Sequence, residues 1–356
     1  MKYIQNIEKF VENKKVFCGI DIHKKHWSLC YYSDGELLEK FSIQGDSMIL
    51  LSHTDSRYYA ARSVHFVYEA GFSGFHLHRQ LVAAGYDSSL TPPNRVPTIL
   101  DKVKTDKRDA EKLAQYHASD LLKKVYVPSA SAEADRQLLR LRNSYQKKLT
   151  RVKNQIKSHL NLYGITQAPE GTNKWTKKYL LWLEELEFEE SNLRIVLDHY
   201  LLEYHFLRDQ IADVTKRIRH LAKSEPYQYH FSLLITCKGI GLITAMTILL
   251  ELSDISRFDS SEKFCSYLGL TPSQYSTGNH VRLGHITREG NAHLRRVLIE
   301  SAWTAKRYDP ALDKKYERIK AKGTNGKKAI VAVARTLAVR LRRCLLDGTP
   351  YVIGEC

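Results

Sequence analysis

The chain has 356 residues, of which 55 are Lys or Arg and 39 are Asp or Glu, so its formal net charge is +16. This length favours two or three domains, and so basic a balance indicates a polyanionic partner such as nucleic acid. No apolar run reaches membrane-spanning length and no signal-peptide pattern opens the chain, so we expect neither a membrane protein nor a secreted one.

The first predicted elements are three strands in hairpin order. Val16–Ile22 and Trp27–Tyr32 are short β-type runs, Asp34-Gly35 is a turn, and Leu37–Ile43 continues as a third strand. Strand and helix signals then alternate, and the further elements are a helix from Asp46 to about Arg62, a strand at Val64–Tyr68, a helix at Phe72–Ala84, a strand at Ser88–Thr91 and a helix at Asp106–Leu122. This order predicts a mixed α/β sheet of the ribonuclease H type.

Two long helices are predicted next, over residues 131–163 and 190–223. Apolar residues recur every three or four positions in both, which is the spacing of a coiled-coil seam. The pair could form an antiparallel hairpin or a seam between subunits. The first helix has eight Lys or Arg and two acids, which favours a surface that faces nucleic acid over plain helical packing.

From about residue 230 the chain is predicted to be mostly helical, with a long loop over 267–291. Residues 281–343 hold 17 Lys or Arg and five Asp or Glu, so most of the net charge lies in this segment. We therefore expect three parts: an α/β domain over 1–128, coiled-coil helices over 129–225 and a helical domain over 226–356.

The six cysteines form neither a CxxC pair nor a Cys/His zinc pattern. Several lie inside apolar runs, where a free cysteine usually acts as a small buried side chain. This usage indicates a reducing cytoplasm. The cysteines are Cys18, Cys30, Cys237, Cys265, Cys344 and Cys356.

Four carboxylates are the candidate catalytic residues. Asp21 and Glu69 each end an apolar strand, where an acid is costly unless it is paired or binds metal. Asp106 and Asp109 open a predicted helix on one face, although a first-turn acid is also favoured by the helix dipole alone. Together the four favour a site that holds divalent metal against a phosphodiester.

Two later segments are candidates for nucleic-acid contact. Lys238-Gly239-Ile240-Gly241 precedes an apolar helix and resembles a clamp on the DNA backbone, although an ordinary helical connection has the same pattern. The predicted loop is rich in hydroxyl groups around Ser276, which composition alone makes a turn residue. Arginines flank this loop and could hold phosphate; they are Arg282, Arg288, Arg295 and Arg296.

These motifs, in this order, resemble the transposases of the insertion sequence one-ten family, the DEDD recombinases related to the Piv invertase. The resemblance covers nearly the whole chain. It rests on the blocks Gly19–Lys24, Tyr68–Ala70, Lys104–Ala110, Gly269–Gly278 and Gly284–Asn291, with Leu294-Arg295-Arg296 after them.

The resemblance implies a RuvC-like domain, a coiled-coil region and a helical transposase domain in a prokaryotic protein that meets DNA at the nucleoid. It implies that Asp21, Glu69, Asp106 and Asp109 bind Mg²⁺, as two ions. It also implies that Ser276 attacks DNA to form a phosphoserine link. The implied partners are double-stranded DNA, a noncoding bridge RNA and further copies of the chain, as dimers that assemble to tetramers.

Some departures from the family pattern bear on the serine. Gly278-Asn279 stands where many members have Gly-Gly, and Thr277 stands where a second serine is common. Ser273 and Thr277 therefore remain alternative candidates to Ser276 for the nucleophile. In the clamp segment, Cys237-Lys238 precedes Gly239 where Pro is common.

Three other functions share parts of this pattern. The alternative is a hydrolytic nuclease of the Holliday-junction-resolvase kind, which would use the carboxylates alone. An actin-type or sugar-kinase ATPase also begins Gly-Ile-Asp-Ile but needs a small residue soon after the Asp, where this chain has His23-Lys24-Lys25. A catalytically silent binding protein would not need all four acids.

Overall fold

The computed structural model describes residues 6–96, 105–165, 168, 170, 172, 174–277, 280–287, 289–323 and 325–354. For Arg95 and for residues 274–277 and 280–283 it describes the backbone alone. Two compact units make up the chain, Met1–Val127 and Pro128–Cys356, and each is described by itself. No helix in the described ranges is long and apolar enough to cross a membrane.

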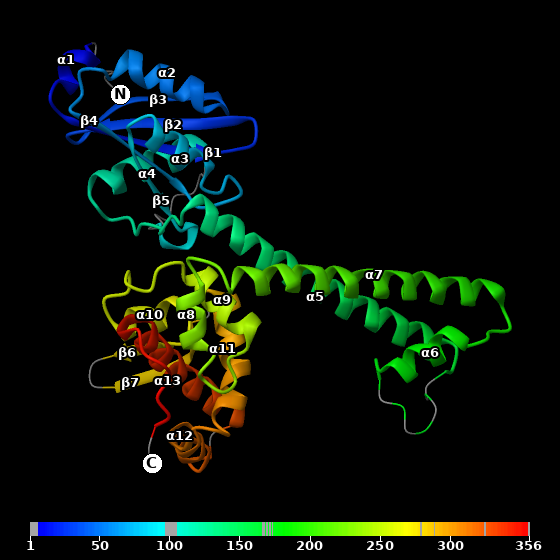
Figure 1. The fold of residues 1–356 in the computed structure, drawn as a ribbon. Coiled ribbons are helices and arrows are strands. Elements are labelled where there is room, and N and C mark those ends of the chain that lie inside the picture. The colour runs from blue at the N-terminus through cyan, green and yellow to red at the C-terminus, as the bar shows by residue number, and fades with distance from the viewer. Residues whose placement is uncertain are drawn as a thin grey trace. The chain divides into compact units, whose positions relative to one another are not determined.

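A five-stranded mixed sheet forms the centre of the first unit (Figure 1). The strands lie in the order β3-β2-β1-β4-β5. β1 pairs antiparallel with β2 and parallel with β4, so the sheet changes from antiparallel to parallel at β1. The strands are β1 (Lys15–Ile22), β2 (His26–Ser33), β3 (Glu36–Gln44), β4 (Ser63–Glu69) and β5 (Asp87–Thr91). The predicted mixed sheet is therefore confirmed.

Helices cover both faces of this sheet. Val16, Cys18 and Ile20 of β1 join the main core on one face, together with side chains of α1 (Ile7–Val11), α2 (Ser47–Arg57) and α3 (His76–Ala83). Because side chains alternate along a strand, Gly19 and Asp21 lie on the opposite face. That face is covered by α4 (Asp106–Ala118), and a short 3₁₀ helix, η1 (Pro93–Arg95), follows β5.

The approach of α4 to β1 depends on Gly19. A Cβ at this position would lie 2.1 Å from the carbonyl oxygen of Ala110 and 2.6 Å from the amide nitrogen of Ala114. Both atoms belong to the backbone of α4, so no side chain can move aside to make room. Any residue larger than glycine would push the helix away from the strand.

Three helices of this unit are shorter than predicted. α2 is capped by the Asp46 carboxylate, as expected, but it ends at Arg57 because the next residues pair with the N-terminal segment. The amide of Asn13 donates to Ala60, and that of Arg62 donates to Lys14. α3 begins at His76 rather than Phe72, because Gly74 (φ +58°) forms a turn before it. α4 ends at Ala118, four residues before the predicted Leu122.

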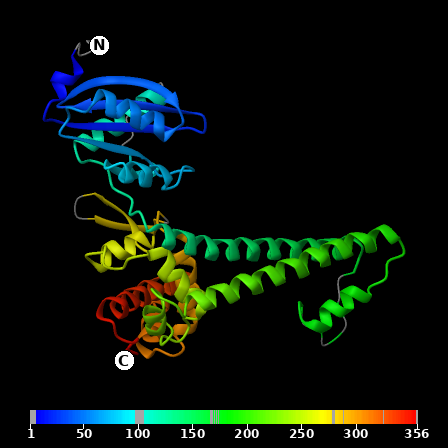
Figure 2. The same cartoon turned by 45° about the horizontal axis from the view of Figure 1, so that its top comes forward.

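The second unit begins with two long helices that lie side by side, α5 (Ala130–Leu162) and α7 (Ser191–Leu221) (Figure 2). They run antiparallel: Arg142 of α5 donates to Thr215 of α7, and His159 bonds the carbonyl of Leu193. The predicted helices and their apolar faces are therefore present. A short helix that was not predicted, α6 (Lys177–Glu185), packs against the same apolar cluster.

The rest of the second unit is a helical bundle around one large core. α13 runs through it and packs against α8, α10, α11 and α12. Met246 and Leu250 of α9 join this bundle to α5 and α7. The helices are α8 (Gln228–Leu234), α9 (Leu242–Leu252), α10 (Ser261–Tyr267), α11 (Ala292–Ala305), α12 (Pro310–Lys320) and α13 (Gly326–Asp347).

The prediction of a long loop over residues 267–291 is wrong. This segment contains an antiparallel hairpin of β6 (Pro272–Thr277) and β7 (His280–Ile286), in which Ser276 pairs with Val281. We call it the serine hairpin. The Pro, Gly and Asn signals mark the ends and turn of a hairpin as readily as a loop. Gly278 and Asn279, which come between the two strands in the sequence, lie outside the described residues.

The close contact at Gly19 makes a testable prediction. We expect Gly19→Ala to lower the free energy of unfolding of the first unit by about 3 kcal/mol, because backbone must move to admit the methyl group. The measurement is the urea midpoint, with hydrogen exchange along α4 as a local readout. Gly71→Ala is the matched control, since its Cβ would meet nothing closer than 3.9 Å. Equal midpoints for the two variants would contradict this account of the helix contact.

Candidate functional site

The first two candidate acids lie at the ends of adjacent parallel strands. The pairing of β1 with β4 includes Ile20 with Tyr68, and Asp21 and Glu69 are the next residue on each strand. Val67 of β4 packs with Leu113 of α4, so Glu69, two residues further on, lies on the same face as α4. Asp21 lies on this face as well. Both acids are thus at the carboxyl ends of strands. They lie where the pairing changes from antiparallel, between β1 and β2, to parallel, between β1 and β4.

The other two acids lie in the first turn of α4. Asp106 is the first helical residue, after the N-cap Thr105, and Asp109 follows three residues later. The same contact that brings Ala110 against Gly19 brings this turn to the end of β1. The N-terminal end of a helix carries a partial positive charge, which helps to hold anionic side chains there.

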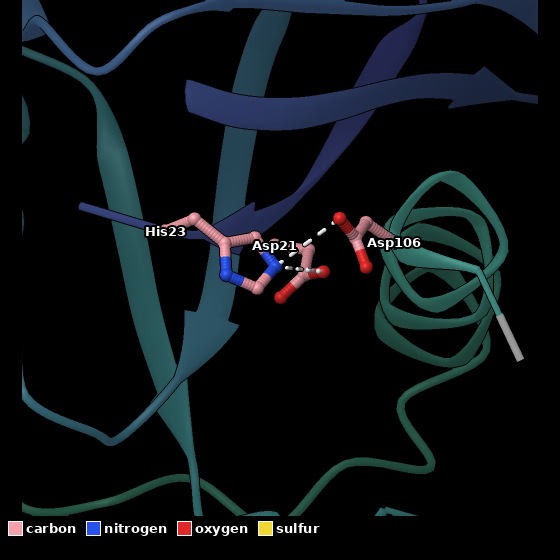
Figure 3. Close-up of side chains that lie close together, drawn as sticks. All are labelled: Asp21, His23 and Asp106. Carbon is pink, nitrogen blue, oxygen red and sulfur yellow. Dashed lines mark ion pairs between the residues drawn. The ribbon is translucent and has the colours of Figure 1, made fainter. Parts of the chain in front are cut away.

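Asp21, Asp106 and His23 form a compact cluster (Figure 3). The His23 Nε2 atom lies 3.3 Å from an Oδ2 atom of each aspartate, and one potential ligand atom from each residue lies within 4.8 Å of the others. The side chain of Asp21 is 25% exposed, whereas His23 and Asp106 are 55% and 62% exposed. The cluster is therefore open to a ligand on one side.

Burial raises the pKa of the Asp21 carboxyl above its usual value. The negative charges of Asp106 and Asp109 add to this rise, while His23 opposes it. Asp109 thus acts electrostatically on Asp21, although it is not a member of the cluster. A cation bound among these groups would relieve the repulsion that raises the pKa.

The four predicted acids are thus brought to one edge and one face of the sheet, with two of them in direct proximity. Glu69 is exposed and Asp109 is half-buried. Carboxylate oxygens with an imidazole nitrogen are a donor set that suits divalent cations. His23 was not predicted as a site residue. The available signal was its position two residues after Asp21, beyond the strand end.

The predicted backbone clamp is a connection between α8 and α9. Lys238 and Gly241 are exposed, and no side chain caps the amides at the start of α9. Gly239 has a different role, because its φ is +99° and a Cβ there would lie 2.9 Å from the carbonyl oxygen of Ser301. The lack of a side chain at Gly239 therefore serves packing against α11.

The hydroxyl-bearing residues lie on β6 of the serine hairpin. Ser276 and Thr277 are placed by their backbones, in register with Val281 and His280. The rival Ser273 donates its hydroxyl to the carbonyl of His285, at 3.1 Å. That bond engages Ser273 within the hairpin.

The structure describes the side chains of only two of the four predicted arginines, Arg295 and Arg296. The backbone of Arg282 lies in β7, and Arg288 lies outside the described residues. Arg295 donates to the carbonyl of Leu268, so part of its role is to hold the chain before the hairpin. Arg296 is 53% exposed, with Glu300 at 3.9 Å as its partner one turn along α11.

The cysteines of the described ranges are buried and free of disulfides; they are Cys18, Cys30, Cys237, Cys265 and Cys344. Burial raises the pKa of each thiol above its usual value. These thiols are consequently protonated and unreactive near neutral pH. Cys356 lies outside the described residues.

Two family models match the chain. Residues 18–165 match the DEDD model of the IS110 type, described as "Transposase", and this range contains all four candidate acids. Residues 231–317 match the model described as "Transposase IS116/IS110/IS902 family", and this range contains the serine hairpin.

Named relatives agree with these matches. The chain is 28% identical to a "Transposase for insertion sequence element IS1533" from Leptospira borgpetersenii, over 93% of this chain and 95% of the relative. It is 27% identical to a "Transposase for insertion sequence element IS1111A" from Coxiella burnetii, over 81% and 79%. It is 33% identical to a "Putative transposase y4qE" from Sinorhizobium fredii, where the alignment covers 71% of this chain and spans 61% of the relative's length.

The first matched range contains the four candidate acids, and the second, further along the same chain, contains the serine hairpin. The chain therefore carries transposase domains of the IS110/IS116/IS902 family, and its named relatives are transposases, enzymes that cut and rejoin DNA.

Proposed function

We propose that this transposase cuts and rejoins DNA through a covalent phosphoserine intermediate at Ser276, and that Asp21, Glu69, Asp106 and Asp109 hold two Mg²⁺ ions for this reaction. The observation that carries the proposal is the convergence of Asp21, Asp106 and His23 at the end of β1. The match of residues 18–165 to the DEDD transposase model supports the use of divalent metal.

The proposed fold of the first unit is RuvC-like. Its support is the strand order β3-β2-β1-β4-β5, with β1 to β3 antiparallel and β4 and β5 parallel to β1. In open sheets of this kind, ligands bind outside the carboxyl ends of the strands where the order reverses. Asp21 and Glu69 occupy that position. The second unit would then comprise coiled-coil helices to about residue 225 and a transposase domain after them.

The reaction is a phosphoryl transfer in which the number of phosphoester bonds is conserved. The Ser276 Oγ atom forms a bond to phosphorus, the bond from phosphorus to the 3′ oxygen breaks, and the hydroxyl proton passes to solvent while the leaving oxygen gains one. Attack by another 3′ hydroxyl reverses these steps and joins a new strand. Divalent metal would neutralise charge on the attacked phosphate. The carboxylates position that metal, and cationic side chains orient the DNA.

Nucleic acid would contact the second unit through its cations. Lys238 and the exposed amides at Gly241 suit a DNA phosphate, and Arg282, Arg288, Arg295 and Arg296 suit the strands near Ser276. A noncoding guide RNA would bind the basic surface of α5, which has eight Lys or Arg.

The chain would act as a dimer that assembles to a tetramer. The support is an apolar stripe on α7, formed by Ile195, Leu202 and Phe206, whose exposures are 51%, 66% and 58%. These residues follow a heptad-like spacing, which is the pattern of a helix that packs against a second helix. A second copy of α7 would cover the stripe.

The serine assignment predicts a covalent product. We expect Ser276→Ala to abolish protein–DNA adducts, because no other oxygen at that position can attack phosphorus, while binding of duplex DNA stays within about twofold of the parent. Adducts are measured by denaturing electrophoresis of labelled DNA substrate. Ser273→Ala is the matched control on the same strand and should keep adduct formation.

Adducts that persist in Ser276→Ala and vanish in Ser273→Ala would move the nucleophile to Ser273. Cleavage by the parent without any adduct would favour the hydrolytic nuclease instead.

If the carboxylate cluster binds metal, variants that remove its donor groups should have a lower metal affinity. We expect Asp21→Asn and Asp106→Asn each to weaken Mn²⁺ binding by about 10-fold or more, and His23→Ala to weaken it by a smaller factor, because each removes a donor atom. Isothermal titration of the DNA-free protein measures this directly. Glu111→Gln is the control, since Glu111 lies on the same helix but pairs with Lys40 at 2.6 Å. Unchanged Mn²⁺ affinity in Asp21→Asn would rule out the metal role of this cluster.

A further inference from the structure

Glu251 is a buried acid in the last turn of a helix that has no other charged residue. It lies on α9, whose other residues between Leu242 and Leu252 are all uncharged, and its side chain is 0% exposed. An ionised carboxylate in such a place is very costly unless other groups bind it. Its contacts therefore indicate why it is there.

Glu251 is held by two partners from different parts of the second unit. The Arg140 guanidinium of α5 donates to both carboxylate oxygens, each at 2.9 Å. The Asn291 side-chain amide donates to the same carboxylate at 2.8 Å. Burial alone would raise the pKa of Glu251, but these hydrogen bonds outweigh it and hold the pKa below its usual value. Glu251 is therefore ionised and bound at neutral pH.

Both ends of the segment that contains the serine hairpin meet at Glu251. On the far side of the hairpin, Asn291 binds the carboxylate, caps α11 with its own side chain, and donates its backbone amide to Tyr267 at 2.9 Å. On the near side, the Tyr267 hydroxyl donates to the Glu251 carbonyl at 3.2 Å. A further backbone bond, from Thr287 to Thr271, closes the base of the hairpin.

Stability alone does not explain an ion pair whose carboxylate is fully buried. Replacing such a pair with apolar side chains of similar volume is often neutral or stabilising, because desolvation offsets the attraction between the charges. What a forked Arg–carboxylate contact with a third donor adds is a single defined geometry. That geometry is imposed on Asn291, at the base of the hairpin.

We propose that Glu251, bound by Arg140, is a positioning residue that fixes the serine hairpin through Asn291. The proposal rests on the proposed role of Ser276 for its effect on catalysis, but the positioning itself concerns the hairpin backbone. Glu251 touches no reacting atom in this arrangement. It sets the direction in which the hairpin leaves the helical bundle.

The test is a double variant, Arg140→Met with Glu251→Met, which removes the charges together and fills the space with apolar side chains. We expect its melting temperature to stay within about 4 °C of the parent and duplex DNA binding to be unchanged. Hydrogen exchange at the Thr287 and Asn291 amides should become about 10-fold faster or more. Adduct formation should fall by about 10- to 100-fold, since small misplacements of reacting groups have effects of this size.

A second variant covers the case in which the double variant fails to fold. Arg140→Lys keeps the charge on a side chain that is 39% exposed and removes only the forked contact. We expect the same pair of changes, faster exchange at the hairpin base and fewer adducts. Arg142→Lys is the matched control, because Arg142 lies two residues further along α5 and bonds Thr215 rather than Glu251.

The outcomes separate this proposal from the proposed function. Parent-like exchange and parent-like adduct formation in the double variant, or in Arg140→Lys if the double variant does not fold, would show that the pair only packs and would overturn the positioning role. Faster exchange at the hairpin base would support that role even if the parent formed no adducts, a result that would overturn the serine mechanism alone.

Discussion

The contact between α4 and β1 is the constraint on which the acidic site depends. Asp21 has a fixed place at the end of its strand, but Asp106 and Asp109 reach it only because the helix backbone lies against the bare Cα of Gly19. A helix displaced by the thickness of one methyl group would carry its first turn away from Asp21. The cation–carboxylate chemistry proposed for this unit therefore begins with a steric fact about one residue without a side chain.

The two units hold their reactive groups in different ways. In the first, the acids are aligned by regular backbone geometry: strand register for Asp21 and Glu69, and helical spacing for the pair on α4. In the second, Ser276 lies on a two-stranded hairpin that pairs with no other strand of the described residues. A two-stranded ribbon is weakly stable alone. Side-chain bonds at its base, through Asn291 and Glu251, supply what the backbone pairing lacks.

Much of this arrangement could be predicted from the sequence, because the signals are local. Alternating apolar residues and the Asp34-Gly35 turn predict the first three strands, and the three-to-four spacing predicts both long helices. Acids at strand ends and in a first helical turn mark the four candidate acids of the site. Family resemblance then points to Ser276, which composition alone leaves as a turn residue.

The remainder depends on contacts between distant residues. α2 ends early because Ala60 pairs with Asn13, nearly fifty residues before it. The serine hairpin resembles a loop in composition, since its strands are short and rich in polar residues. His23 becomes a candidate ligand only when Asp106 lies beside it, and Glu251 gains its partners from residues 111 positions before and 40 after it. No window of sequence contains those pairs.

The alternation of side chains along β1 also limits how the chain can evolve. One face of this strand packs into the main core and the other carries Gly19 and Asp21 toward α4. Insertion or deletion of one residue between Val16 and Asp21 would exchange the two faces, burying the carboxylate in the core and turning apolar side chains to the helix. Substitutions in this strand can therefore be tolerated during evolution, whereas insertion or deletion of a single residue cannot. In descendants of this element, the spacing from core to carboxylate should outlast the identity of most residues within it.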